Sequence, residues 1–329
     1  MTDAAPTVGV VVSGTGGVWR IRTSAGETVD ASIRGRLKKS NSGKRADGSL
    51  RRDTVAAAAE TLKLTVGDDV RLEQAHDSDG GAWAIAEILP RRSQLARRAP
   101  GGGQGERVVA ANVDQVVVLF AAAQPEPHPR MLDRFLVIAE GNNLTARIVV
   151  NKIDLVGADA ARARFRVYEH IGYSVIYTSV KSGAGLEAAR AMLGGRRSVV
   201  TGPSGVGKSS LLNALFPGAN LRVGAISESV NKGRHTTVGS TMLSLPGDAG
   251  GYVIDTPGLR EVGLWALPVE ELDCCFPEMA SLRGHCRFAD CQHRHEPECA
   301  VIGAVRSGSI SAARYDSYLR LLDDLRVTR

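Results

Sequence analysis

Two short runs of the sequence contain residues suited to binding a nucleotide, and they stand in an unusual order. Residues 202–209 are GPSGVGKS, and residues 151–155 are NKIDL. A glycine-rich loop between a strand and a helix can direct backbone N–H groups at phosphate oxygens. A carboxylate in the second run can accept two N–H donors of guanine that adenine lacks. In ordinary GTP-binding domains the phosphate loop comes first along the chain, whereas here it follows the base-binding run.

The phosphate loop has the flanking elements that such a loop requires. RRSVV (196–200) predicts a strand, and SSLLNALF (209–216) predicts a helix. Lys208 adds a full charge at the phosphates, where it serves both binding and catalysis, and the hydroxyl of Ser209 is suited to Mg²⁺. The predicted phosphate-binding residues are Gly202, Pro203, Ser204, Gly205, Val206, Gly207, Lys208, Ser209 and Ser210.

Two later runs complete the expected Mg²⁺ and γ-phosphate contacts. VIDTPG (253–258) ends an apolar strand with Asp255, in the manner of a Walker-B acid, and continues to Gly258, whose N–H can bond the γ-phosphate. The polar run NKGRHTTVGS (231–240) is the predicted switch loop. Within it Thr237 is the preferred second Mg²⁺ ligand and a catalytic residue. Taken alone, this stretch would be a plain surface loop.

The base-binding run supplies the guanine contacts. Asp154 is the predicted acceptor for the guanine N1–H and 2-amino groups, with Asn151 and Lys152 supporting the edge and the ring face. TSVKSG (178–183) offers backbone groups to the guanine O6. The predicted base-binding residues are Asn151, Lys152, Ile153, Asp154, Ser179, Val180 and Lys181.

The residue that orients the attacking water is the least constrained part of the site. Leu259 follows DTPG where many GTPases have a glutamine, and leucine has no hydrogen-bonding group. His235 is the nearest polar substitute, because an imidazole can orient or deprotonate water. The alternative is that His235 packs against the switch loop or contacts RNA.

The five site elements therefore occur in the order base, base, phosphate, switch, switch. Domain termini commonly lie close together, so a chain can be joined there and cut elsewhere without losing its sheet. We interpret the order as a circular permutation with the cut between the DTPG strand and the strand before NKID. The second switch then leads directly into the C-terminal segment.

The segments around the site predict three architectures in succession. Short β-rich runs at 8–12, 18–23, 28–33, 69–74 and 82–89 predict a five-stranded barrel, for which an OB-fold is one solution and an SH3-like barrel another. The basic, glycine-rich residues 91–107 predict a flexible boundary. From residue 113 strands and helices alternate, which predicts a mainly parallel α/β sheet. A final helix is expected at 310–325.

A dense basic run interrupts the barrel strands. Residues 31–52 hold eight Lys or Arg residues against one acid, Asp47. Glycine and serine in the run favour a loop over a helix. We interpret it as a contact surface for a nucleic-acid backbone, with a solvated basic loop as the alternative. The basic residues are Arg34, Arg36, Lys38, Lys39, Lys44, Arg45, Arg51 and Arg52.

All five cysteines fall within residues 274–299, so they do not cross-link the chain. Cys286, Cys291, His293 and Cys299 could form a closed tetrahedral shell for one structural Zn²⁺. His285 and His295 are alternatives to His293 on spacing alone, and buried free cysteines are the alternative to a metal site. Cys274 and Cys275 are expected to pack in the interior.

Composition limits the class of protein. A 43% hydrophobic and 23% charged chain with net charge +6 is ordinary for a globular protein. The first residues lack the basic and apolar regions of a secretory signal, and the apolar run at 116–123 is too short for a membrane span. We expect a monomer in the cytoplasm with no membrane contact.

The chain resembles the RsgA family, also called YjeQ, of circularly permuted GTPases that depend on the small ribosomal subunit. The resemblance is carried by NKID, GPSGVGKSS, KGRHTT, DTPG, CFPEM and the run CRFADCQHRHEPEC, in this order. Val238 stands where the family often has a third threonine. The resemblance implies an N-terminal OB-fold, a central permuted P-loop GTPase domain and a mainly helical zinc domain. It also implies GTP and GDP as ligands, late action in 30S subunit assembly, contacts to 16S rRNA and stimulation by the subunit.

The expected domains follow from these signals: an OB-fold RNA-binding domain at 1–90, a basic linker at 91–112, the GTPase domain at 113–265 and the zinc domain at 266–329. Two other functions would each account for part of the sequence. A plain RNA-binding module with a passive nucleotide site conflicts with the intact Lys208, Ser209 and Asp255. A zinc-handling metallochaperone GTPase is the main alternative, although a closed four-ligand site releases zinc poorly.

Overall fold

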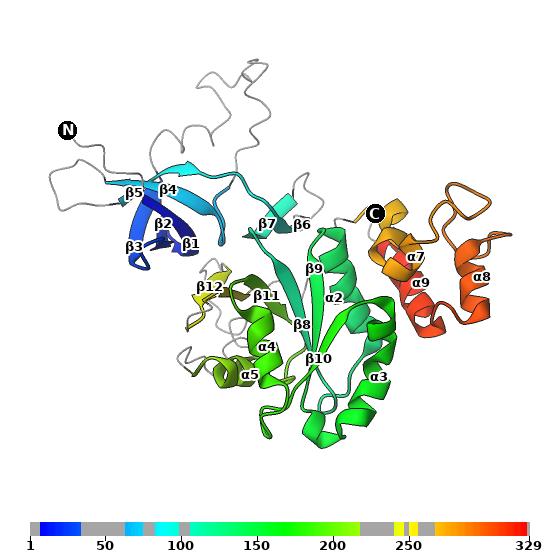
Figure 1. Cartoon of the computed structure of the whole chain (residues 1–329). Helices are drawn as coiled ribbons and strands as arrows, with labels where there is room; N and C mark the ends of the chain where they lie inside the picture. Colours follow the sequence, from blue (N-terminus) through cyan, green and yellow to red (C-terminus); the bar gives the residue numbers. More distant parts are fainter. Residues whose placement is uncertain are drawn as a thin grey trace, which may run out of the picture.

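The computed structural model describes residues 7–33, 63–74, 83–98, 106–217, 240–246, 250–255 and 267–327. It has three parts (Figure 1): a closed β-barrel near the N-terminus, a central sheet flanked by helices, and a C-terminal group of helices. This arrangement confirms the predicted fold class. None of the described helices is long and apolar enough to span a bilayer.

The barrel has the strand order β1-β2-β3-β5-β4 and closes through pairing of β4 with β1. The pairing of β3 with β5 is parallel, while the other neighbours are antiparallel. Inward side chains such as Val11, Ile21 and Ile85 fill its interior. The strands are β1 (Thr7–Thr15), β2 (Val18–Thr23), β3 (Thr28–Ile33), β4 (Asp69–Gln74) and β5 (Trp83–Ile88).

A two-stranded antiparallel sheet connects the barrel to the central sheet. Strands β6 (Gln94–Arg98) and β7 (Glu106–Ala111) lie in the segment for which the sequence predicted a linker. Packing of Leu95 and Ala110 into the main core favours pairing here, which the glycine-rich composition did not indicate. The boundaries of the domains stay predictions.

Charged side chains join the barrel to the central sheet. On the barrel side, Arg91, which follows β5, forms a bidentate pair with the buried carboxylate of Asp68, which precedes β4, at 2.7 and 2.9 Å. The guanidinium of Arg197 contacts Asp69 at 2.7 Å and the carbonyl of Gly67 at 3.1 Å. Arg197 is the first residue of β11, so the strand that leads to the phosphate loop starts at the barrel.

The central sheet has six strands in the order β10-β9-β8-β11-β13-β12. All neighbours are parallel except β12 and β13. The short edge strand β12 has no counterpart among the predicted elements. The strands are β8 (Gln115–Ala121), β9 (Thr145–Asn151), β10 (Ser174–Tyr177), β11 (Arg197–Thr201), β12 (Thr241–Ser244) and β13 (Tyr252–Asp255).

The strand order confirms the circular permutation. The first strand of the sheet, β8, lies in its middle beside β11. From β8 the chain moves outward through β9 and β10, returns to the centre at β11, and then fills the other side. A chain that began with the phosphate-loop strand β11 would build the same sheet, with β13 preceding β8.

Helices cover both faces of the sheet because its central strands are apolar on both sides. Every residue of β8 is buried. Its side chains alternate between one core, which includes Val116 and Phe120, and another, which includes Val117 and Leu119. The helices are α2 (Pro129–Gly141), α3 (Ala158–Ile171), α4 (Leu186–Leu193) and α5 (Lys208–Leu215).

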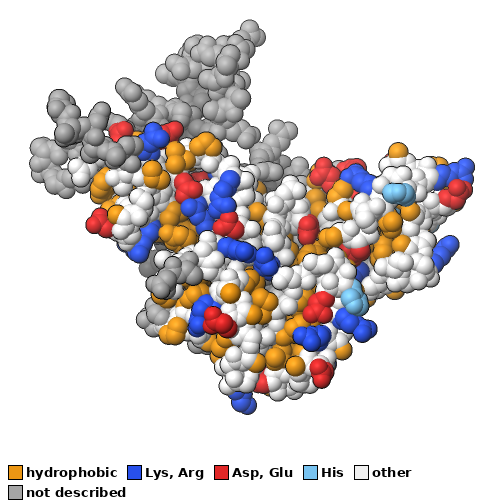
Figure 2. Space-filling view, in the orientation of Figure 1, with side chains coloured by type: hydrophobic (Ala, Val, Ile, Leu, Met, Phe, Trp, Pro, Cys, Tyr) orange, Lys and Arg blue, Asp and Glu red, His pale blue; other side chains and the backbone are white. Residues whose placement is uncertain are grey.

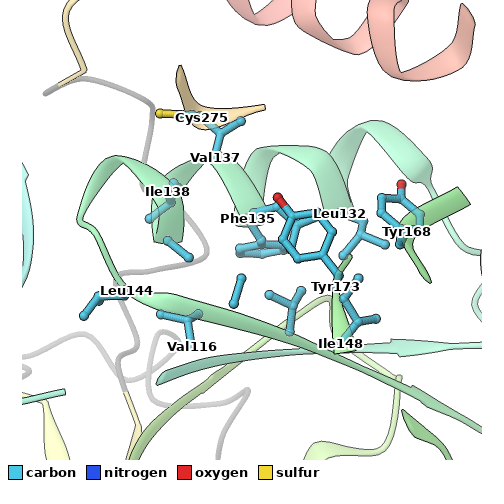
Figure 3. Close-up of a cluster of buried hydrophobic side chains, with 14 of the residues drawn as sticks. Val116, Leu132, Phe135, Val137, Ile138, Leu144, Ile148, Tyr168, Tyr173 and Cys275 are labelled. Atoms are coloured by element: carbon cyan, nitrogen blue, oxygen red, sulfur yellow. The ribbon is translucent and has the colours of Figure 1, made fainter. Parts of the chain in front are cut away.

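The core under α2 also receives the C-terminal part of the chain. Leu132 and Phe135 of α2 face Val116 and Ile148 of the sheet, and Val137 points toward Cys275 (Figure 3). Burial raises the pKa of the Cys275 thiol to about 12, so this thiol is an apolar packing group. The C-terminal elements are the 3-10 turns η4 (Val269–Glu271) and η5 (Asp273–Cys275), with helices α7 (Pro277–Ala280), α8 (Ala300–Ser307) and α9 (Ala312–Val327).

A buried charge network joins α2, α7 and α9. The guanidinium of Arg314 bonds Asp133 of α2 at 2.7 Å and Glu278 of α7 at 2.7 and 3.2 Å. It also lies 4.5 Å from the ring centre of Phe276. The hydroxyl of Tyr168 on α3 donates to Asp133 at 2.8 Å. The Arg314 side chain is 2% exposed and that of Asp133 1%, so water does not satisfy either group.

Arg314→Met is expected to destabilise the protein strongly. The substitution keeps much of the apolar volume but leaves two buried carboxylates without their cation, which typically costs about 3–5 kcal/mol. Thermal unfolding with hydrogen exchange in α2 measures the effect. Arg320→Met is the matched control, because Arg320 pairs with Asp316 at the exposed surface, where solvent screens the charges and such a pair adds little to stability. Equal effects of the two variants would contradict a structural role for the network.

Candidate functional site

The predicted nucleotide-binding runs follow parallel strands, and their carboxyl ends meet at one edge of the sheet. NKID begins at the end of β9, TSVK follows β10, and the glycine-rich loop follows β11. Ligands of open α/β sheets bind at this edge. Residues separated by about 50 positions along the chain therefore face one site.

The glycine-rich loop has a backbone conformation that residues with a Cβ could adopt only with strain. Gly202 has φ +137°, and a Cβ there would lie 2.0 Å from the Leu119 carbonyl oxygen. Gly207 has φ +94° and would bring a Cβ within 2.6 Å of the Asn151 amide nitrogen. These glycines let the loop pass close to β8 and to the NKID run before α5 begins at Lys208.

Lys208 and Ser209 occupy the first turn of α5 and are both 7% exposed. The Lys208 ammonium bonds the loop carbonyls of Gly202 at 2.8 Å and Pro203 at 2.6 Å. Its charge therefore lies over the loop, at the positive end of a helix. This is an arrangement that favours phosphate oxygens.

Asn151 and Lys152 connect the base-binding run to the phosphate loop. The Asn151 amide, which is buried, donates to the Val206 carbonyl at 3.0 Å and accepts from the Thr178 hydroxyl at 3.2 Å. Lys152 adopts a left-handed backbone with φ +61°, and its ammonium bonds the Gly205 carbonyl at 2.7 Å. Both side chains thus link the loops, a role that the sequence analysis did not assign to them.

Asp154 and Ser179 come together from neighbouring strand ends. The Ser179 hydroxyl donates to the Asp154 carboxylate at 2.6 Å and accepts from the Ser182 N–H at 3.1 Å. Ser179 is fully buried, so this contact fixes the direction of the carboxylate. From the sequence, only the backbone of Ser179 was predicted to contact the base. The signal that could have indicated the contact was a hydroxyl at the end of one strand, with the predicted base ligand Asp154 at the end of the neighbouring strand.

The remaining predicted site residues are only partly described. Asp255 is the last residue of β13, which pairs with β11 directly before the phosphate loop. Val180 and Lys181 lie in the turn after β10, with Lys181 exposed. His235, Thr237, Gly258 and Leu259 lie outside the described residues, as does the basic run from Arg34 to Arg52.

A separate cluster lies in the C-terminal part. One ligand atom from each of Cys286, Cys291, His293 and Cys299 lies within 4.8 Å of the others. His285 and His295 do not belong to this group of four. The arrangement can hold a metal ion.

The cluster has the dimensions of a tetrahedral Zn²⁺ shell. His293 Nδ1 lies 3.6, 3.4 and 3.3 Å from the sulfurs of Cys286, Cys291 and Cys299. The sulfurs of Cys286 and Cys299 are 3.9 Å apart. Bond lengths of about 2.3 Å to sulfur and 2.0 Å to nitrogen place tetrahedral ligand atoms about 3.5–3.8 Å apart. Three thiols and one imidazole therefore suit zinc, with Nδ1 as the histidine ligand.

Neighbouring groups fix the loop that carries His293. The Glu296 carboxylate accepts from the backbone N–H groups of Gln292, Arg294 and His295 at 2.7–3.0 Å. Desolvation raises the pKa of Glu296, but these donors outweigh it and lower the pKa to about 2. The Tyr315 hydroxyl donates to the His293 carbonyl at 2.5 Å.

The protonation of His293 reflects the same surroundings. Burial lowers its pKa, while Asp273 and the Cys299 sulfur together raise the pKa to about 9. A metal ion must therefore compete with a proton at this ring, since only the neutral imidazole is a ligand.

Comparison with known proteins yields consistent matches. A family model described as RsgA GTPase matches residues 88–265. The chain is 54% identical over 320 residues to the "Small ribosomal subunit biogenesis GTPase RsgA" of Gemmatimonas aurantiaca, covering 97% of each chain. A protein of the same description from Moorella thermoacetica is 42% identical, over 81% of this chain and 86% of the relative.

Solved structures match over nearly the whole chain. YjeQ from Thermotoga maritima has a TM-score of 0.76 and 32% identity, covering 98% of this chain and 100% of its own. YloQ, described as a circularly permuted GTPase, has a TM-score of 0.70 and 26% identity, covering 98% of this chain and 96% of its own.

Proposed function

This chain belongs to the RsgA family of circularly permuted GTPases, and we propose that it hydrolyses GTP as a late assembly factor of the 30S ribosomal subunit. Membership makes it a GTP-hydrolysing enzyme of small-subunit biogenesis, with GTP, GDP and the subunit as partners. Binding to 16S rRNA, acceleration of hydrolysis by the subunit, a monomeric state and a cytoplasmic location belong to the proposal.

The convergence of three loops at one sheet edge carries the proposal. The phosphate loop, the Asp154–Ser179 pair and the Asn151 link from Thr178 to Val206 form one connected site. We assign guanine recognition to Asp154, phosphate binding to the loop with Lys208, and Mg²⁺ binding to Ser209 and Thr237. Mg²⁺ would supply charge neutralisation at the β- and γ-phosphates.

The permutation gives a route from nucleotide state to the C-terminal helices. β13 ends at Asp255, and the chain then leads through the DTPG switch into η4 and η5. η5 packs on α2, which lies on the central sheet, and Val269 of η4 joins the same core. We propose that γ-phosphate contacts at the switch alter the position of this C-terminal part, since switch segments are commonly ordered by the γ-phosphate.

The basic run from Arg34 to Arg52, which follows β3 in the sequence, is proposed to contact rRNA phosphates. In the described residues, Lys and Arg side chains also gather where the barrel meets the central sheet (Figure 2). Basic residues on and beside a small barrel fit a nucleic-acid backbone.

Replacing Lys38, Lys39, Lys44 and Arg45 with alanine is expected to weaken binding to the 30S subunit, and the loss should shrink as salt rises. Each phosphate contact removed should reduce the slope of log affinity against log salt by about 0.7–0.9. Titration of 30S binding at several salt concentrations measures this slope. An unchanged slope would identify the run as a solvated loop.

Cosedimentation with ribosomal subunits tests the proposed partner. The protein is expected to sediment with 30S subunits in the presence of a non-hydrolysable GTP analogue, and less with GDP. Isolated 50S subunits serve as the control. Equal sedimentation with 30S and 50S subunits, independent of nucleotide, would contradict the proposal.

The metallochaperone alternative rests on the Cys/His cluster sharing a chain with a GTPase site. The cluster argues against it, because four ligands leave no open position and two of them, His293 and Cys299, are buried. We therefore propose one structural Zn²⁺. Release of zinc in step with GTP hydrolysis would favour the alternative.

A further inference from the structure

The turn η5 places one carboxylate behind the metal cluster, on the side of His293 that faces away from the sulfurs. Asp273 Oδ2 lies 3.5 Å from His293 Nε2, slightly longer than the usual N–H···O distance of about 2.7–3.2 Å and within reach of an ion pair. The Asp273 side chain is 12% exposed and that of His293 4%. The two ring nitrogens therefore have different surroundings: Nδ1 faces three sulfurs, and Nε2 faces a carboxylate.

The Asp273 carboxylate is itself held in place. Its Oδ1 accepts from the Cys274 N–H at 3.0 Å, and the Arg283 guanidinium lies 3.8 Å from Oδ2. Oδ1 thus caps the turn, while Oδ2 faces the imidazole at 3.5 Å, with the Arg283 guanidinium slightly farther away. Histidines that bind metals commonly give the other ring N–H to a carboxylate, which fixes the tautomer and the ring orientation.

The other end of His293 is fixed by α9. His293 adopts a left-handed backbone with φ +57°, and the Tyr315 hydroxyl holds its carbonyl oxygen. With its backbone held by Tyr315, the ring needs one further contact to keep Nδ1 directed at the sulfurs. Asp273 is the group in position to provide it.

We propose that Asp273 is a positioning residue for the metal cluster: it orients His293 and links metal occupancy to the packing of η5 on α2. This inference rests on the zinc site proposed above. The link exists because Cys275, two residues after Asp273, is buried against α2 in the main core. Val137 and Gly141 of α2 face this thiol, and a Cβ on Gly141 would lie 3.6 Å from its sulfur.

Asp273→Asn tests the orienting role without a large change of shape. In asparagine an NH2 group replaces one carboxylate oxygen, so when the remaining oxygen caps the Cys274 N–H, a donor and not an acceptor faces His293 Nε2. The zinc dissociation constant, measured on the full chain by competition with a chromophoric chelator, is expected to rise about 10–100-fold. The ligand-field bands of the cobalt-substituted protein are expected to shift, while its thiolate charge-transfer bands remain.

Asp290→Asn is the matched control, because Asp290 is an exposed carboxylate between Cys286 and Cys291. Asp290→Asn should leave the zinc dissociation constant and the cobalt spectrum unchanged if Asp273 acts by orienting His293 and not merely by adding negative charge near the cluster. Equal zinc affinity and cobalt spectra in wild type and Asp273→Asn would overturn this inference alone. Wild-type protein that binds no zinc would overturn the proposed zinc site as well.

The link to α2 has its own readout. Removal of zinc from the wild type is expected to increase hydrogen exchange at residues 137–141, where α2 meets η5. Exchange in α4, on the other face of the sheet, provides the internal reference. Unchanged exchange at residues 137–141 after zinc removal would overturn the link.

Discussion

Asp154→Asn is expected to abolish the preference for GTP over ATP. The carboxylate is directed by the buried Ser179 hydroxyl at 2.6 Å, and an amide there presents a donor where guanine also presents one. Sites built around buried polar pairs reject mismatched ligands by about 10⁴ at the upper end. Competition binding of GTP and ATP to the purified protein measures the ratio.

The same contact provides a graded control. Ser179→Ala removes the hydroxyl that directs Asp154 but keeps the carboxylate, so it should reduce guanine preference by a smaller factor. Retention of the wild-type preference in Asp154→Asn would show that guanine is recognised elsewhere. A larger loss in Ser179→Ala than in Asp154→Asn would be equally inconsistent with the assigned roles.

His235→Ala is expected to remove the acceleration of GTP hydrolysis by 30S subunits while leaving GTP affinity nearly intact. Leu259 has no group to orient water, so another residue has to supply one, and His235 is the nearest polar candidate in the sequence. We propose that the subunit brings the His235 imidazole into line with the attacking water. GTPases without their activating partner turn over about 10³–10⁵ times more slowly. Stimulated single-turnover hydrolysis is the measurement.

Two comparisons separate this role from loss of binding. GTP affinity and cosedimentation with 30S subunits should be unchanged in His235→Ala, whereas Thr237→Ala should also lose Mg²⁺-dependent GTP binding. A fully stimulated His235→Ala variant would assign the water-orienting group to the ribosome or to another switch residue.

Elements with local sequence signals were predicted with accurate bounds. β2, β3 and β4 extend over the predicted residues 18–23, 28–33 and 69–74. In these segments the alternation of apolar and polar residues and the flanking turn residues indicate the same strand ends. The parallel strands β8 and β9 were also recognisable, because burial on both faces requires a continuous apolar run.

The features that the sequence analysis missed depend on distant partners. β12 is a four-residue edge strand whose only described pairing is with β13, and β6 pairs with β7 across a glycine-rich segment. Arg314 meets Asp133 across 181 positions. Its place in α9 gave no sign of burial, since an arginine in a polar helix is ordinarily exposed. Nothing in the sequence marked Asp273 either, because its proposed role depends on its position opposite His293 in the fold.

Steady-state GTP hydrolysis with and without purified 30S subunits tests the central claim most directly. The protein alone is expected to turn over slowly, and 30S subunits should raise the rate by about 10³-fold or more, as an activating partner does for other GTPases. Isolated 50S subunits should have no comparable effect. A rate that 30S subunits leave unchanged, in protein that binds GTP, would contradict the account.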